Sequence, residues 1–370
     1  MSESEEAQPL RTTNGPPGRP FSRAGLVLLG ILAAVFFWFA GRLLLLVFAG
    51  VLFAIFLRTG AGFLSKYLRL PSGWSLLLFV LLLLGGATTA GWLFAPSLAE
   101  QARDLTEAVP KAYSQLTDRL RETTWGGWVL DQVEEGQNAQ EDGAMVGHAT
   151  TAAWRLIDGI VAFVVVLFVG LYLAVDPQAY VRGVLRLVPM ARRRRAGEVL
   201  YATGYQLRWW LLGQLLSMIV VGLIMGIGLA FIGVPLAFAL GVLAGLLEFI
   251  PTIGPPLAVI PALLLALVDE PQKALYVLIL YAALQIIESY LLTPLVQQRA
   301  VHLKPVVTIT AQVFFAWTFG AIGILIAVPL IAAVQVAVQM WYVEDLLSDN
   351  LKIVAEREGR RELEEDHIFG

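Results

Sequence analysis

The sequence predicts an all-α polytopic membrane protein, and three observations indicate this class: its hydropathy, the length of its apolar runs and two runs broken by proline or glycine. Apolar residues make up 58% of the chain, charged residues 15%, and the mean hydropathy is +0.72. Several runs supply the roughly 20 residues that a helix needs to cross a hydrocarbon core of about 30 Å. We expect about six full transmembrane helices and two re-entrant helical hairpins, with an inverted repeat in the C-terminal half.

Composition also excludes several kinds of site. The chain contains no cysteine, which rules out disulfides, thiol chemistry and thiolate metal sites. Its histidines, His148, His302 and His367, lie far apart without metal-ligand spacing, so no metal site is expected. No phosphate-binding loop, nucleophile elbow or helical His–Glu pair is present. We therefore expect no enzyme and no resident cofactor.

Hydropathy and charge divide the chain into segments. They are a disordered cytoplasmic tail (1–23), N-terminal transmembrane helices (24–95), an extracytoplasmic amphipathic helix and loop (96–150), a transmembrane helix with a basic cytoplasmic loop (151–205), a repeat of one helix plus one re-entrant hairpin (206–272), a second such repeat (273–343) and a cytoplasmic tail (344–370).

The N-terminal spans are predicted from two short apolar runs and a longer one. Gly25–Ala40 and Leu43–Leu57 flank Gly41-Arg42, so we expect a tight hairpin or a bent pair there, followed by a span over Trp74–Phe94. Basic residues precede the first run and follow the second. By the positive-inside rule both flanks are cytoplasmic.

The segment after the third span is acidic and periodic. Its apolar residues recur every three or four positions, which is typical of an amphipathic helix: Leu98, Ala102, Leu105, Val109, Ala112, Leu116 and Leu120. This stripe either packs on the chain's own membrane domain or contacts a neighbouring subunit, and both hypotheses stay open.

A basic run, Arg192–Arg195, follows the fourth span, Trp154–Val175. Such a run is typical of a cytoplasmic loop that lies against anionic lipid headgroups. No aromatic stacking platform accompanies it, so we expect no nucleic-acid partner.

The C-terminal half contains landmarks that recur at a nearly constant offset. Gln214 and Gln285 are 71 residues apart, Pro235 and Pro305 are 70 apart, and Pro261 and Pro329 are 68 apart. The two spans, Trp209–Phe231 and Ala274–Leu292, each precede a broken apolar hairpin, 235–268 and 306–342. The second hairpin is interrupted near Phe319-Gly-Ala-Ile-Gly323. The pattern predicts an inverted repeat with broken helices near the membrane midplane, as in many secondary transporters.

Polar residues inside these apolar runs are the candidate path for a solute or ion. Gln285 and Glu288 are three apart and share a helix face, where Glu288 either exchanges protons or binds a cation, or clamps a helix end. Glu248 either faces the path or caps backbone amides of the break. Gln214 makes either a second polar contact or an interhelical hydrogen bond.

The break in the first hairpin is shaped by residues that cannot continue a helix. Pro251, Pro255 and Pro256 remove hydrogen-bond donors, and Gly254 gives backbone freedom or close approach. Broken backbone at membrane depth survives only inside protein or beside a water-filled cavity. These residues predict the tip of a re-entrant hairpin that lines the path.

These motifs resemble the autoinducer-2 exporter (AI-2E) family of bacterial permeases over about Trp154–Tyr342. The matching residues are Phe249-Ile-Pro-Thr-Ile-Gly-Pro255, Gly213-Gln214, Gly233-Val-Pro235, Gln285-x-x-Glu288, Pro294 and Gly320-x-x-Gly323 with Val328-Pro329. The resemblance implies a multi-pass secondary transporter of the bacterial inner membrane, with both termini cytoplasmic by the charge pattern. It also implies a homo-oligomer, pentamers among the possibilities.

Three functions follow as expectations. The first is export of a small polar metabolite or signal, similar to autoinducer-2, by alternating access. The second is exchange of Na⁺ or Li⁺ against protons, with H⁺ or Na⁺ as coupling ion. The third is a membrane scaffold that transports nothing.

Overall fold

The computed structural model describes residues 23–121, 145–292 and 304–345, and the regular secondary structure in these ranges is helical throughout. Six of its helices are long and apolar enough to cross a membrane, which confirms the predicted all-α polytopic class. Most of the predicted tails, the loop at 136–143, and Pro294 lie outside the described residues. The chain divides into two compact units, Met1–Leu44 and Leu45–Gly370.

Helix α1 (Arg23–Leu68) begins in the first unit and runs without interruption through Gly41 and Arg42. Of the two arrangements predicted here, a tight hairpin or a bent pair, the tight hairpin is therefore wrong. The physical reason is that one glycine costs a helix only about 1 kcal/mol and arginine is a good helix former. The cytoplasmic placement of the N-terminus, which the hairpin supported, stays a prediction.

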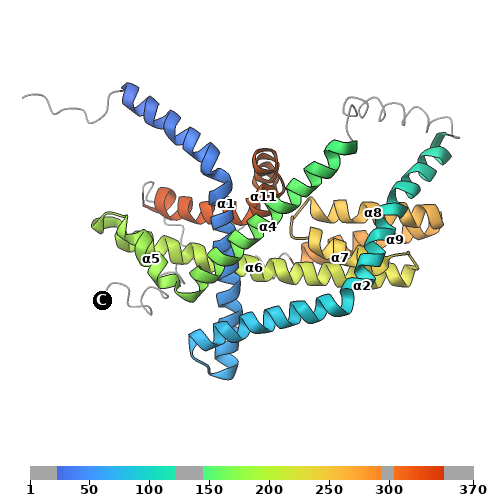
Figure 1. Cartoon of the computed structure of the whole chain (residues 1–370), viewed down its shortest axis with the longest axis horizontal. Helices are drawn as coiled ribbons and strands as arrows, with labels where there is room; N and C mark the ends of the chain where they lie inside the picture. The colour runs from blue at the N-terminus through green and yellow to red at the C-terminus, as the bar shows by residue number, and fades with distance from the viewer. Residues whose placement is uncertain (1–22, 122–144, 293–303, 346–370) are drawn as a thin grey trace, which may run out of the picture. The chain divides into compact units, whose positions relative to one another are not determined.

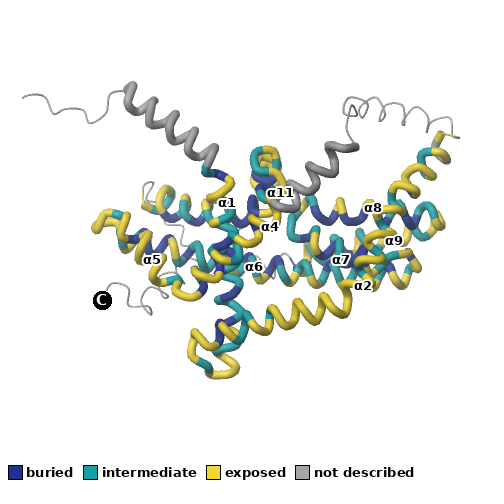
Figure 2. The backbone as a smooth tube through the Cα atoms, in the orientation of Figure 1, coloured by how far each residue is buried: buried dark blue, intermediate teal, exposed yellow. Residues whose placement is uncertain are grey.

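The second unit contains the remaining helices (Figure 1). They are α2 (Ser72–Arg121), α4 (Met145–Val175), α5 (Pro177–Arg186), α6 (Met190–Ile232), α7 (Ala237–Leu247), α8 (Gly254–Asp269), α9 (Pro271–Ile287) and α11 (Pro305–Val338), with two short π-helices, η1 (Glu288–Leu292) and η2 (Gln339–Glu344). Figure 2 shows buried residues recurring along α6, α7 and α8, whereas most of α2 is exposed.

Helices α1 and α4 cross at two glycines and are joined by one arginine. A Cβ added at Gly50 would lie 2.6 Å from a methyl of Val169, and one at Gly170 would lie 3.0 Å from the Gly50 carbonyl oxygen. The last carbonyls of a helix have no partner within it. Arg58 supplies that partner, because its guanidinium donates to the carbonyls of Ala174 (2.6 Å) and Val175 (2.9 Å).

Helices α6 and α7 pack backbone against backbone. A Cβ at Gly241 would lie 2.5 Å from the Cα of Gly226, and one at Gly245 would lie 2.8 Å from the Met218 carbonyl oxygen. The chain reverses between the two helices at Gly233 (φ 79°) and Leu236 (φ 60°). Small residues at such a crossing permit the close approach that stabilises helix pairs in membranes.

Both predicted hairpins are broken where proline or glycine indicated. Helices α7 and α8 have 11 and 16 residues, about 16 and 24 Å at 1.5 Å per residue, short of a core of about 30 Å. They are joined by residues 248–253, which we call the hairpin turn. Helix α11 has a non-helical residue at Gly320 (φ 64°, ψ −143°). Their re-entrant placement and inverted orientation stay predictions.

The C-terminal, amphipathic part of α2 packs on the first hairpin. Ala112 is buried in a cluster with residues of α6, α7, α8 and α9, and Leu105 and Ala108 pack against the same cluster. Gln101 accepts a hydrogen bond from the backbone amide of Ala239, at the start of α7 (3.2 Å). At these positions the stripe contacts its own chain, as the first of the two hypotheses expected.

The start of α6 is joined to the end of the described chain by Arg195. Its guanidinium binds the carboxylates of Glu198 (2.9 Å), Glu344 (2.7 Å) and Asp345 (3.0 Å), and the carbonyl of Met340 (2.9 Å). This member of the basic run therefore acts inside the protein, whereas the prediction placed the run against lipid headgroups.

Candidate functional site

The hairpin turn lies between the C-terminal end of α7 and the first residue of α8. Several local backbone bonds hold it, among them Glu248 N–H to Ala244 (2.9 Å), Ile250 N–H to Leu247 (2.9 Å) and Gly254 N–H to Ile250 (2.9 Å). Carbonyls of the turn remain for other elements. In a membrane protein such broken backbone requires partners from neighbouring helices.

Two glutamines from different helices supply those partners. The side-chain amide of Gln214, on α6, donates to the carbonyl of Glu248 (2.5 Å). The amide of Gln312, on the first half of α11, donates to the carbonyl of Pro251 (2.9 Å). Gln312 is fully buried and Gln214 nearly so. The turn is thus bound by α6 and by α11.

Glu248 places a carboxyl group in this enclosed turn. The residue is only 2% exposed, and its Oε2 atom has no hydrogen-bond partner among the described residues. This oxygen therefore does not cap the amides of the turn, which was one of the two roles predicted for it. A buried polar atom without a partner is rare in folded proteins and calls for an explanation.

Glu288 is the acidic neighbour of Glu248. The two side chains interact electrostatically, and Tyr281 of α9 interacts with both. Gln285 donates to Oε2 of Glu288 (3.0 Å). Glu288 is half-buried and begins η1, and π-helical segments of this kind often occur at functional sites.

The proline and glycine residues of the break shape it in different ways. A Cβ at Gly254 would collide with the carbonyl oxygen of Leu247, so only glycine permits the chain to enter α8 here. Pro255 is buried and Pro256 exposed at the first turn of α8, where a missing N–H costs no hydrogen bond. Thr252 adopts a positive φ of 74°, which is strained for a β-branched residue.

The structure brings most of the predicted site residues to one place. Glu248 and Gln214 meet at the hairpin turn, and Glu288 acts on Glu248 while binding Gln285. Sequence reasoning missed Gln312. The available signal was a single amide in an apolar run, the same signal that identified Gln214. Among the described residues no group of three or more Asp, Glu, His or Cys side chains is placed to hold a metal ion.

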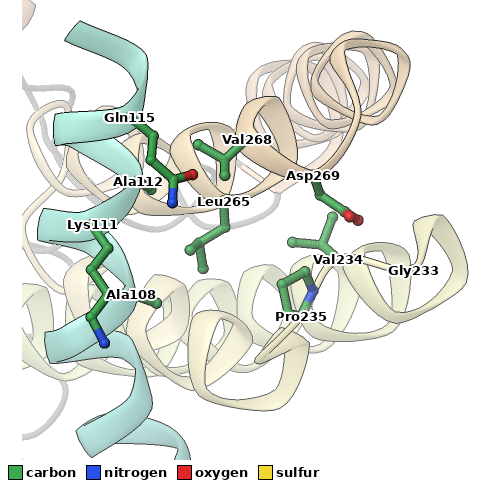
Figure 3. A pocket seen from close by; sticks show the side chains of 10 residues that line it. All are labelled: Ala108, Lys111, Ala112, Gln115, Gly233, Val234, Pro235, Leu265, Val268 and Asp269. Carbon is green, nitrogen blue, oxygen red and sulfur yellow. The ribbon is translucent and has the colours of Figure 1, made fainter. Parts of the chain in front are cut away.

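A separate pocket of about 680 Å³ lies at the other end of the first hairpin. Figure 3 shows it between α2, which contributes Lys111 and Gln115, and the end of α8, which contributes Leu265 and Asp269. Lys111 pairs with Glu107 (3.3 Å), and Asp269 pairs with Lys273 (2.5 Å). The charged groups of this pocket are thus neutralised locally, which makes the hairpin turn the stronger candidate.

Comparisons with known proteins agree with a transport role. A family model described as "AI-2E family transporter" matches residues 26–343. The chain is 28% identical to putative transport protein YrrI of Bacillus subtilis strain 168 over 279 residues, 72% of this chain and 78% of that protein. It is 27% identical to putative transport protein YueF of the same strain over 304 residues, 78% and 80% of the two chains.

A shorter match carries a substrate in its name. The AI-2 transport protein TqsA of Escherichia coli strain K12 is 34% identical over 122 residues, which cover 33% of this chain and 36% of that protein. The three relatives have transport in common.

Proposed function

Because the chain belongs to the AI-2E family of transporters, we propose that it is a secondary transporter that moves a small polar solute across the bacterial inner membrane by alternating access. The observation that carries this proposal is a buried carboxyl group, Glu248, in a helix break that α6 and α11 hold by hydrogen bonds. Polar groups buried in membrane-spanning segments are costly and mostly serve substrate or ion paths.

Export of a signal similar to autoinducer-2 is the form of this function that we propose first. The relative TqsA is named for AI-2 transport, and the acceptor groups of the hairpin turn suit a small hydroxylated solute. The lipid bilayer and the solute are then its partners, and assembly into a homo-oligomer stays a prediction.

The test is solute efflux from proteoliposomes. Vesicles that contain the purified full chain are loaded with autoinducer-2, and release is measured with and without a pH or sodium gradient. We expect release above that of protein-free vesicles, and a loss of at least tenfold in Glu248→Gln. The matched control is Gln272→Leu, which should keep the wild-type rate. Gln272 is an exposed residue of α9, and its side-chain amide donates to the hydroxyl of Tyr276 (2.8 Å). Equal release from vesicles with and without protein would contradict export of this solute.

Cation–proton exchange is the second candidate, and the proximity of Glu248 to Glu288 favours it. Two carboxylates that repel each other bind a proton or a cation more readily than either would alone. The same vesicles with an internal pH dye distinguish this function, because an antiporter collapses a pH gradient when Na⁺ or Li⁺ is added. Flux that survives Glu288→Gln unchanged would exclude that residue from the exchange.

A further inference from the structure

The geometry points to the hairpin turn as a binding site for solutes that present hydrogen-bond donors, hydroxyl or ammonium, with Glu248 and Gln312 as the acceptors, and as a site that rejects anions. This inference rests on the proposed transport function and adds the chemical class of the solute. It also assigns to Gln312 a direct role in recognition.

The first step is that the donors of the turn are already used. The amide nitrogens of Gln214 and Gln312 donate to the carbonyls of Glu248 and Pro251. The oxygens at the same place are not used. Oε2 of Glu248 and Oε1 of Gln312 are buried and have no hydrogen-bond partner among the described residues.

The second step is that both side chains lie at the same short turn. Gln312 donates to the carbonyl of Pro251, which lies three residues after Glu248 in the hairpin turn. Gln312 is 0% exposed and Glu248 is 2% exposed. Buried acceptors are normally satisfied, and leaving them without a donor is unfavourable. A ligand that brings an N–H or O–H group supplies what both oxygens lack.

The third step concerns charge. The side chains of the turn offer the acceptor oxygens of Glu248 and Gln312, while the amide donors are already used, so an anion finds no free amide donor there. A carboxylate or phosphate solute would bring more acceptors and more negative charge. Bound Ca²⁺ takes about six to eight oxygen ligands, whereas two free side-chain oxygens are available here. Ammonium and hydroxyl groups therefore fit better than anions or metal ions of this kind.

Small probes test this without knowledge of the natural solute. The melting temperature of the full chain in lipid nanodiscs is measured by tryptophan fluorescence. Methylammonium chloride and erythritol are the two donor probes. Sodium erythronate, which has the erythritol skeleton with a carboxylate, is the anionic probe. Sodium chloride is the match for ionic strength. We expect the two donor probes to raise the melting temperature of the wild type, and erythronate and sodium chloride to have no such effect.

The substitutions assign the shift to the turn. Glu248→Gln places a donor beside the free oxygens and removes the charge, so it should abolish the shift caused by both donor probes. Gln312→Leu, the second variant, should weaken it at least threefold. Gln339→Leu is the matched control, because Oε1 of Gln339 is also buried without a partner but lies in η2. It should retain the wild-type response.

Several results would overturn the inference. One is that erythronate or sodium chloride raises the melting temperature as much as the donor probes do. Another is that the donor probes still raise the melting temperature of Glu248→Gln. The third is that neither donor probe changes the melting temperature of the wild type. The assay measures equilibrium binding. A failure of solute efflux alongside a positive binding result would therefore count against transport and not against this site.

Discussion

At the scale of one residue, Arg195 shows how a cation can be buried between helices that are distant in sequence. Its side chain is 19% exposed, and those of Glu198 and Glu344 are 9% and 11% exposed. A planar guanidinium can donate to several acceptors at once, which a lysine cannot reproduce. Removal of one partner of a buried ion pair leaves the other charged and unpaired. The resulting loss of stability exceeds the net stabilisation that the pair itself provides.

We therefore predict that Arg195→Gln lowers the free energy of unfolding by about 3 kcal/mol. Arg194→Gln is the matched control, since Arg194 is 78% exposed and lies 3.6 Å from the same Glu198. Its loss should change stability by less than about 1 kcal/mol. Thermal unfolding in detergent micelles measures both variants, and equal destabilisation by the two would show that the buried network is not what stabilises this end of α6.

At the scale of an element, the pairing of α6 with α7 depends on the absence of side chains. Gly222, Gly226, Gly241 and Gly245 bring the two backbones together, with a hypothetical Cβ at Gly222 only 3.2 Å from the Gly241 carbonyl oxygen. Because Gln214 lies on α6 and Glu248 follows α7 directly, this packing also sets how the amide meets the carbonyl of the turn. The site therefore depends on a glycine contact that begins at Gly245, three residues before Glu248, and continues at Gly241.

We expect Gly241→Ala to destabilise the protein by about 1–3 kcal/mol, because the added methyl would overpack the contact with Gly226. Gly204→Ala, also in a helix of this unit, meets nothing within 4 Å. There the greater helix propensity of alanine should raise stability by about 0.5–1 kcal/mol. Melting temperatures that move in opposite directions for the two variants are the expected result, and a fall for both would contradict it.

At the scale of the whole molecule, the charge pattern predicts which loops face the cytoplasm. The basic segment around α5 and the start of α6 should be cytoplasmic, and the acidic C-terminal part of α2 should lie outside. The chain has no cysteine, so single cysteines can be introduced without removing any. Orientation can thus be measured on the full-length protein.

We predict that a membrane-impermeant maleimide labels Ser114→Cys in intact spheroplasts and labels Gly183→Cys only after lysis. Both positions are exposed, and a Cβ at Gly183 would meet no atom within 4 Å. Labelling with the opposite pattern would invert the orientation, and equal labelling of both in intact cells would contradict the predicted topology.

The sequence was most informative where a residue type leaves few conformations open. Prolines 251, 255 and 256 with Gly254 predicted the first break, and Gly320 the second, because neither proline nor a glycine at positive φ continues a helix. Gly41-Arg42 was misleading, since a helix tolerates this pair and nothing local distinguishes a turn from a continuous helix.

Long-range partners were harder to predict. Gln285 and Glu288 were predicted to share a helix face, and they bond each other there. Gln214 was identified because it interrupts an apolar run, but its partner, the Glu248 carbonyl, depends on how helices pack. Gln312 has the same local signature and was missed, since its role depends on contact with Pro251, 61 residues earlier. Arg195 was assigned to lipid headgroups because its acceptors, such as Glu344, lie 149 residues away.

The glycine contact between α6 and α7 has a consequence for how the transporter would move. Where two helix backbones are in direct contact, no side chains between them can change rotamer, so α6 and α7 should move together as one rigid body. Flexing is then left to joints outside this helix pair, such as Gly320 in α11, which has a positive φ. The hydrogen bond from Gln312 to Pro251 joins α11 to the hairpin turn that follows α7. If α6 and α7 move relative to α11 during transport, this bond would have to break and re-form in every cycle.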